Sequence, residues 1–223
     1  MTDMLSYDAP SFSPLEPIFA FERESVPPAF RAQFLHSPDD PFRVVLEGRL
    51  HEIWHKPRWL KPLFWALGQA GILVPKSGHN IPSTLEVIPA RHPNGEPYHR
   101  WNRTLQFTPP VHFNTTIVYD PETRYVADLV GPHDFLYLVW KAKFWPPSTF
   151  TLDTEACAAQ IGRQKLWLPR WLWPLLLGVV RFVQKADVDT EDTVHIELII
   201  SHPLFGDFFG YTGTFHVVRY PLN

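Results

Sequence analysis

A succession of about ten predicted β-strands constrains the fold of this 223-residue chain more than any other feature. The segments are rich in Val, Ile, Thr, Phe and Tyr, and many alternate apolar and polar residues with period two. Short turns with proline, glycine or acidic residues separate them, as at 92–95 and 120–123. The predicted strands are 42–50, 84–90, 98–107, 112–120, 124–131, 134–144, 148–156, 181–189, 193–201 and 208–218.

Strands joined by short hairpins favour an antiparallel meander, and a closed or nearly closed sheet leaves few strand edges open. We therefore predict a mainly β fold: a lipocalin-like antiparallel β-barrel of about ten strands with two short helices. The barrel domain is predicted to span residues 42–223. Residues 1–41 contain seven prolines and are predicted to form an irregular N-terminal arm with one short helix near 28–35.

The two predicted helices, 57–71 and 169–180, resemble each other. Both contain Pro-Arg-Trp-Leu-x-Pro-Leu, 112 positions apart, and Glu86 and Glu197 follow them at an offset of 111. Self-similarity at a nearly constant offset is the signature of a repeated structural unit. A pseudo-twofold barrel with one helix in each half is therefore one hypothesis for the architecture.

Composition excludes several classes of protein. The chain is 45% hydrophobic and 19% charged, which is not the composition of a disordered protein. The net charge of −3 supplies no overall positive field, so we expect no nucleic-acid partner. The single Cys157 excludes an internal disulfide, and no basic region followed by an apolar run resembles a secretory signal. We expect a cytoplasmic protein, with membrane association as an open alternative.

One short motif suggests a metal site. Residues 51–55 read His-Glu-Ile-Trp-His, the H-E-x-x-H pattern that binds zinc when it lies on a helix. This segment continues a predicted strand, however, where positions four apart lie about 13 Å from each other. We predict no metal at His51 and His55, and keep a metal-dependent hydrolase as a third hypothesis. Because the chain also lacks glycine-rich phosphate loops, no cofactor is expected. It has no G-x-S-x-G motif either, so no strong motif indicates a reaction class.

A ligand site is predicted inside the barrel. In the strand 98–107, the more apolar face contains Trp101 and Arg103 and should point to the interior. An interior Arg103 needs a carboxylate partner or an anionic ligand, and Asp128 and Glu197 are the candidates for the first. The predicted ligand-binding residues are Trp101, Arg103, Asp128, Tyr137, Trp140 and Tyr211, and the acid–base candidates are His99, Asp128 and Glu197.

Such a site is typical of ligand pockets, which combine an apolar concavity with a few placed polar groups. The leading hypothesis is therefore binding of an apolar or amphipathic small molecule, such as a lipid, an isoprenoid or a polyketide-like compound. The alternative is a cofactor-free cyclase or isomerase that acts on a ligand of this kind.

The tryptophan-rich helices leave two interpretations open. The apolar run 166–183 is long enough to span a membrane, but it contains two arginines and two prolines, so we predict no transmembrane helix. Either the helices cover the barrel ends with their indoles in the core, or they lie in a membrane interface. The residues that would contact the membrane are Trp59, Trp65, Trp171 and Trp173.

The order of motifs along the chain resembles bacterial domain-of-unknown-function family 4166 from about residue 29 to residue 218. The most specific pieces are Trp-x-Arg at 101–103 and the segment Pro-x-x-Gly at 203–206 followed by Tyr-x-Gly at 211–213. Asp128 stands where the family pattern has Glu, and Leu105 where it has Phe. The resemblance implies no established activity, but suggests an accessory module or a domain beside a partner oxidoreductase. Matched by position are Trp101, Arg103, Asp128, Gly131, Pro203, Gly206, Tyr211 and Gly213.

Overall fold

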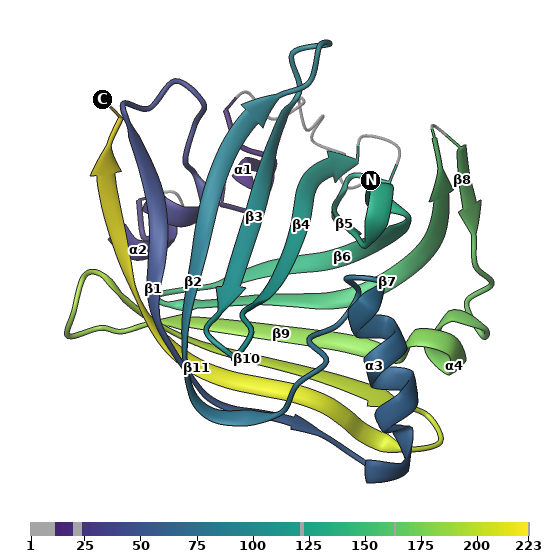
Figure 1. Ribbon diagram of the computed structural model, residues 1–223. Helices are drawn as coiled ribbons and strands as arrows, with labels where there is room; N and C mark the ends of the chain where they lie inside the picture. Colours follow the sequence, from purple (N-terminus) through teal and green to yellow (C-terminus); the bar gives the residue numbers. More distant parts are fainter. Residues whose placement is uncertain (1–11, 20–23, 121–122, 163, 223) are drawn as a thin grey trace.

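Ten antiparallel strands close into a barrel, which confirms the predicted fold class (Figure 1). The computed structural model describes residues 12–19, 24–120, 123–162 and 164–222. Residues 1–11 and 20–23 of the predicted arm, and 121–122 of the predicted turn, lie outside the described residues. The strands are β1 (Phe42–His55), β2 (Gly78–Arg91), β3 (Pro97–Leu105), β4 (Val111–Asp120), β5 (Tyr125–Val130), β6 (Leu136–Trp145), β7 (Thr149–Ile161), β8 (Gln164–Trp167), β9 (Val179–Ala186), β10 (Thr193–His202) and β11 (Gly206–Pro221).

The barrel closes because the two halves of the sheet meet at β6 and β7. Each strand from β1 to β6 pairs with the next, β11 pairs with β1 and β10, and β9 joins β10 to β7. Pairing of β6 with β7 over Leu136–Trp145 and Thr149–Ala159 completes the ring. The strand β8, which the sequence did not predict, pairs only with β7 and extends beyond the ring as a hairpin.

The N-terminal arm closes one end of the barrel with aromatic side chains. Its helices α1 (Glu16–Phe19) and α2 (Pro28–Phe34) place Phe19 and Phe34 in the same core as the strands. The Phe34 ring lies 4.5 Å from that of Phe150 and 6.2 Å from the indole of Trp101, between centroids. The arm is therefore part of the barrel core, and burial of its phenylalanines holds it there.

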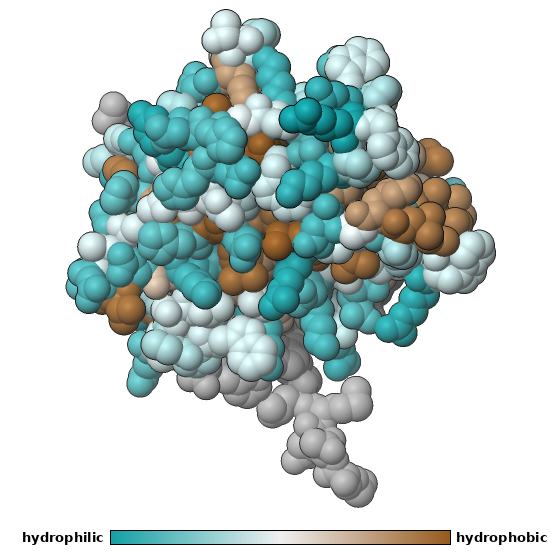
Figure 2. All heavy atoms as spheres, turned by 90° about the horizontal axis from the view of Figure 1, so that it is seen from below, coloured by the Kyte–Doolittle hydropathy of each residue, from teal (hydrophilic) through white to brown (hydrophobic). Residues whose placement is uncertain are grey.

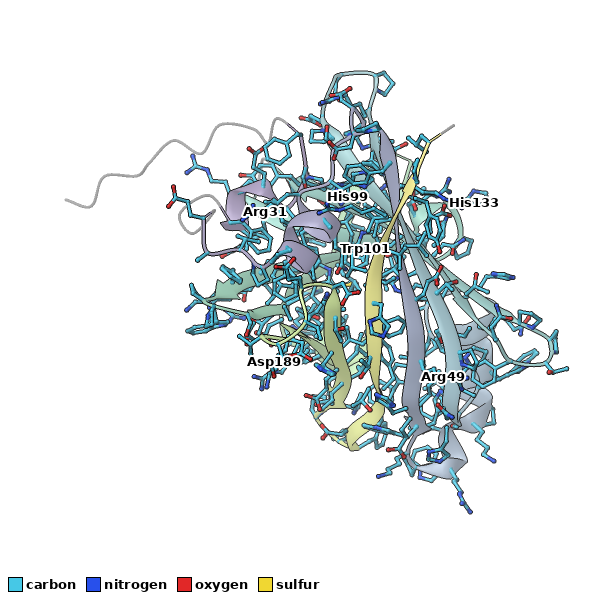
Figure 3. All side chains as sticks on the ribbon, turned by 90° about the vertical axis from the view of Figure 1, so that its left-hand side faces the viewer. Arg31, Arg49, His99, Trp101, His133 and Asp189 are labelled. Atoms are coloured by element: carbon cyan, nitrogen blue, oxygen red, sulfur yellow. The ribbon has the colours of Figure 1, made fainter. Side chains whose placement is uncertain are left out.

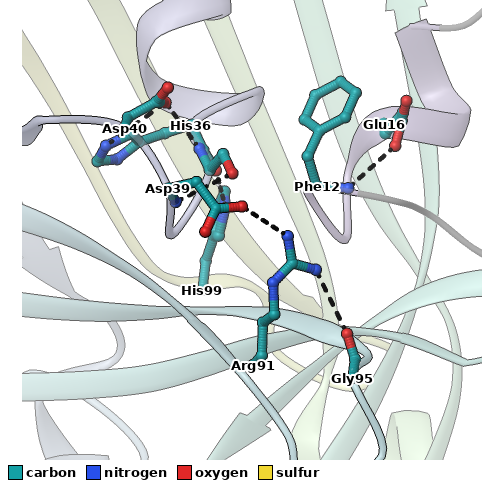
Figure 4. Close-up of polar contacts among 9 residues, drawn as sticks. Phe12, Glu16, His36, Asp39, Asp40, Arg91, Gly95 and His99 are labelled. Carbon is teal, nitrogen blue, oxygen red and sulfur yellow. Dashed lines mark hydrogen bonds and ion pairs between the residues drawn. The ribbon is translucent and has the colours of Figure 1, made fainter.

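Polar contacts also fix the connection between the arm and β1 (Figure 4). Arg91, at the end of β2, donates to the Asp39 carboxylate over 3.0 Å and to the Gly95 carbonyl over 3.4 Å. The His99 ring donates through Nε2 to the His36 carbonyl over 2.8 Å. These bonds tie the arm to β2 and β3, the same strands that bear the site described below.

The other end of the barrel carries short helices, η1 (Arg58–Leu60) with α3 (Lys61–Gln69), and α4 (Trp173–Leu177). Sequence predicted a helix over 169–180, but α4 begins at Trp173, and Gly178, with φ of 77°, ends it after five residues. Trp173 is 5% exposed and belongs to the core, which is the first of the two interpretations given for this residue. No helix in the described ranges is both long and apolar enough to cross a membrane.

The predicted pseudo-twofold repeat does not appear in the connectivity. After α3 the chain enters β2, which carries Glu86. After α4 it first forms β9, and Glu197 lies on the following strand, β10. At the offset of 112 positions, β9 corresponds to residues 67–74, which form the end of α3 and the loop after it. The two halves therefore differ in secondary structure.

The aromatic closure predicts that Phe34→Ala destabilises the whole fold. Phe34 is fully buried, and its removal would leave a cavity between Phe150 and Trp101. We expect the free energy of unfolding to fall by about 3–5 kcal/mol. Urea unfolding monitored by tryptophan fluorescence measures this change in the free energy of unfolding. The matched control is Phe135→Ala in the β5–β6 connection, where the ring is 45% exposed; equal effects of the two substitutions would contradict the closure.

Candidate functional site

An interior cavity of about 150 Å³ lies between the aromatic closure and the α3/α4 end. Almost every strand of the barrel contributes to its walls, which are mainly Leu, Ile, Val and Phe side chains. Trp101 and the Gln33–Gln184 pair bound it on the side of the arm. Leu67 and Leu177, from the ends of α3 and α4, bound it on the opposite side.

Four polar or aromatic residues from three parts of the sheet meet at this cavity: Trp101 and Arg103 on β3, Asp128 on β5 and Tyr211 on β11. Alternation along β3 directs Trp101 and Arg103 inward, as the sequence predicted, and Figure 3 shows Trp101 inside the barrel beside the arm. Arg103 and Tyr211 point inward yet keep accessible surface, because this surface faces the cavity.

Among the residues that the structure describes, the Arg103 guanidinium contacts only neutral groups. Its Nη1 donates to the Thr115 hydroxyl over 3.1 Å. The guanidinium carbon lies 5.2 Å from the ring centroids of both Trp101 and Phe113, a cation–π arrangement. No carboxylate in the described part of the chain lies within ion-pair distance of Arg103. Its charge is therefore only partly compensated.

Asp128 is the carboxyl group that interacts with this charge. Burial raises the pKa of Asp128 to about 7, although the Arg103 charge and a hydrogen bond with Thr115 lower it. Desolvation outweighs the favourable partners because the carboxyl lies in an apolar cavity wall. Near neutral pH the group is close to half protonated, so it can donate or accept a proton.

Several buried polar atoms on the cavity walls lack a hydrogen-bond partner among the described residues. They include Oδ1 of Asp128 and the indole Nε1 atoms of Trp101 and Trp140. At the arm side, the Gln184 amide donates to Gln33 over 2.6 Å, and each side chain keeps one polar atom unpaired. A buried donor or acceptor without a partner costs free energy, about 1–3 kcal/mol.

Three predicted site residues lie elsewhere. Tyr137 is on the outer face, where its hydroxyl donates to Asp120 over 2.7 Å beneath β8. Glu197 is exposed on the outer face of β10 and does not approach Arg103. His99 is buried, but it bonds the arm rather than lining the cavity, and burial lowers its pKa to about 4. Tyr137 and Glu197 therefore lie outside the interior in which they were predicted, whereas His99 lies inside the barrel without lining the cavity.

The H-E-x-x-H segment lies in β1 and not in a helix. His51 contacts the Thr214 hydroxyl over 2.8 Å, whereas His55 bonds the Val74 carbonyl and the Ser77 hydroxyl. The described residues contain no group of three His, Cys, Asp or Glu side chains that could hold a metal ion. We find no geometric support for the hydrolase hypothesis.

Sequence reasoning missed the polar residues Gln33, Ser83, Thr84 and Gln184 of the cavity wall. It also missed Thr115, which accepts the hydrogen bond from Arg103. Gln184 lies two positions from both Phe182 and Ala186 and shares their buried face, so the period of two along β9 could have placed it inside. Thr115 on β4 pairs with Trp101 on β3, a register that a single sequence does not give. Gln33 lies in the proline-rich arm, where no periodicity indicates which side is buried.

The fold and the site define a closed antiparallel barrel whose apolar interior holds an arginine and a carboxyl group. The chain belongs to the family described as "Domain of unknown function (DUF4166)", whose match covers residues 26–215. This confirms the family resemblance found in the sequence. No curated protein and no solved structure gives a significant match.

The residues picked out by the family resemblance fall into two structural groups. Trp101, Arg103, Asp128 and Tyr211 meet at the cavity. Gly131 lies in the turn after β5 and Gly206 is the first residue of β11, with φ of 83° and 63°, where a side chain would be strained. The resemblance therefore combines cavity residues with backbone positions that shape the α3/α4 end.

The pKa of Asp128 predicts a pH-dependent loss of stability. The carboxyl ionises near pH 4 when unfolded and near pH 7 when folded, so the folded protein binds more protons between these values. The free energy of unfolding of the wild type, relative to Asp128→Asn, should fall by up to about 4 kcal/mol as pH rises from 4 to 8. Urea unfolding across this range measures the difference; parallel pH curves would contradict the raised pKa.

Proposed function

We propose that the protein binds a small apolar or amphipathic molecule that carries an anionic or carbonyl group. The observation that carries the proposal is Arg103 in an apolar cavity, where the acid that interacts with it, Asp128, is only partly ionised at neutral pH. A guanidinium without a full counter-ion in an apolar wall is costly. A ligand carboxylate would supply that counter-ion through two parallel hydrogen bonds, the geometry that guanidinium groups favour.

The aromatic walls support the same class of ligand. Trp101 would form a stacking wall beside Arg103, and the unpaired indole N–H groups of Trp101 and Trp140 could bond oxygen atoms of the molecule. A cavity of about 150 Å³ is the size that holds a benzene-sized group in engineered protein interiors. A longer lipid, isoprenoid or polyketide-like ligand would extend between Leu67 and Leu177 toward the α3/α4 end.

Binding of cis-parinaric acid, a fluorescent fatty acid, tests the role of Arg103. We expect Arg103→Met to weaken binding about 10- to 100-fold, because the charged hydrogen bonds to the carboxylate are lost. Arg103→Lys should restore binding poorly, since the planar fork is absent. The methyl ester of the probe, which cannot ionise, should lose much less affinity than the acid. Fluorescence titration gives the dissociation constants.

A cavity-blocking variant and two controls on the outer face make this test specific to the cavity. Arg100→Met removes an exposed arginine from the outer face of the same strand and should leave binding unchanged. Leu198→Trp should block the cavity, whereas Ile199→Trp, the next residue on the outer face, should not. Wild-type affinity in a folded Arg103→Met or Leu198→Trp protein would refute the proposed site.

The second candidate function is a cofactor-free cyclase or isomerase, and the pKa of Asp128 favours it. A carboxyl group with a pKa near 7 and one unpaired oxygen suits proton transfer to or from a bound molecule. Native mass spectrometry of protein purified from its host would identify the ligand that co-purifies. Under the enzyme hypothesis, wild type converts added ligand and Asp128→Asn binds but does not convert it. If neither the wild type nor Asp128→Asn converts the ligand, the enzyme hypothesis is refuted and ligand binding stands as the function.

A further inference from the structure

The α3/α4 end of the barrel exposes large apolar side chains that a folded chain normally buries. Trp59, Trp65 and Trp171 are 65%, 63% and 70% exposed, in contrast to the buried Trp173 of the same region. We call the following residues the tryptophan surface: Trp59, Leu63 and Trp65 from η1 and α3, Trp171, Leu175 and Leu176 from the α4 segment, and Leu204 and Phe205 from the β10–β11 turn.

Contacts between its parts make the tryptophan surface continuous. The Trp59 ring meets the Phe205 ring edge-on, with centroids 5.3 Å apart. Phe205 stacks on His202 at 4.4 Å, and His202 donates through Nε2 to the Leu175 carbonyl over 2.8 Å. This chain of contacts runs from η1 through the turn to α4. Figure 2, seen from below, shows hydrophobic side chains gathered at its right-hand edge, the side of α3 and α4 in Figure 1.

The charge around the tryptophan surface is positive. The segments 56–71, 164–178 and 202–206 contain five Lys or Arg residues and no Asp or Glu, although the whole chain has a net charge of −3. Lys165 pairs with Asp120 over 3.1 Å. The other four are exposed and form no ion pair within the described residues: Lys56, Arg58, Lys61 and Arg170.

The opposite end of the barrel carries acidic residues. The β9–β10 turn has four within six positions, 187–192. Opposite charges at the two ends would orient the molecule in front of an anionic surface, with the tryptophan surface foremost. Electrostatics and apolar exposure thus favour the same face.

We propose that the tryptophan surface docks on an anionic lipid bilayer. Indole rings beside Lys and Arg side chains suit the boundary between headgroups and acyl chains, because each has an apolar body and a polar end. Anionic lipids attract basic side chains near the surface by about 1 kcal/mol each. Four unpaired cations and three exposed indoles on one end therefore match a phosphatidylserine-containing membrane.

Docking would also place the inner cavity near the bilayer. Leu67 and Leu177 line the cavity at the ends of α3 and α4, directly behind the tryptophan surface. An apolar ligand could then exchange with the membrane without crossing water. This consequence rests on the proposed ligand binding, whereas the docking itself does not.

Flotation with phosphatidylcholine vesicles, with and without phosphatidylserine, tests the docking. We expect recovery with the anionic vesicles at low salt, and less at high salt because exposed charges are screened. Trp65→Ser combined with Trp171→Ser should weaken the binding about tenfold, through loss of two indoles from the interface. Lys61→Glu combined with Arg170→Glu should abolish the preference for phosphatidylserine.

The matched control is Trp145→Ser, which removes a 49% exposed indole at the arm end of the barrel. It should float like the wild type, and all variants should keep the wild-type thermal transition because each replaced side chain is exposed. Absence of flotation, or an equal loss with Trp145→Ser, would overturn the proposal. The proposal would also be overturned if light scattering shows a dimer that dissociates in the Trp65→Ser/Trp171→Ser variant, because a second copy of the chain would then cover the tryptophan surface. None of these outcomes would affect the binding of cis-parinaric acid in the cavity, so the proposed ligand binding is tested separately.

Discussion

Closure of the sheet at β6 and β7 is the constraint on which the rest of the molecule depends. Once these strands pair, every inward-facing side chain is separated from bulk water by the barrel wall and by whatever fills the two ends. The phenylalanines of the arm fill one end, so the arm is required for a dry interior. The polar groups left inside are then forced to interact with each other or with a bound molecule.

The electrostatics of the cavity follow from that separation. In water, Arg103 and Asp128 would both be charged and would interact weakly. Inside the barrel, desolvation of Asp128 outweighs the attraction of Arg103, and the pKa of the carboxyl reaches about 7. The Asp128 carboxyl can therefore lose or gain a proton when the charge near it changes. An anion bound to Arg103 would favour the protonated form of Asp128, so ligand charge and Asp128 protonation are linked.

The sequence predicted the ten barrel strands and the inward direction of Trp101 and Arg103, because one face of β3 is more apolar than the other. Tyr137 was assigned to the interior wrongly because both faces of its strand are apolar. The strand β8 and its Trp167 cover the outer side there, which removes the alternation that sequence reasoning uses. Glu197 lies between the inward-facing Ile196 and Leu198, so a stricter use of period two places it outside.

The tryptophans show a limit of a different kind. Trp171 and Trp173 lie two positions apart in one apolar run, yet one is exposed and the other is in the core. A helix of five residues is too short to show an apolar face by periodicity, so local sequence cannot separate them. Their burial therefore depends on tertiary packing, in which His202 at the end of β10 bonds the Leu175 carbonyl of α4.

The two ends of the barrel differ in what opening them would cost. At the arm end, Phe19 and Phe34 would have to leave the core and lose their ring contacts with Phe150 of β7. At the other end, the cavity is bounded by Leu67 and Leu177, which belong to helices of nine and five residues with exposed outer faces. Local opening is cheapest where few apolar contacts are lost. The ligand that we propose would therefore exchange at the α3/α4 end, where the cavity, the short helices and the exposed indoles lie together.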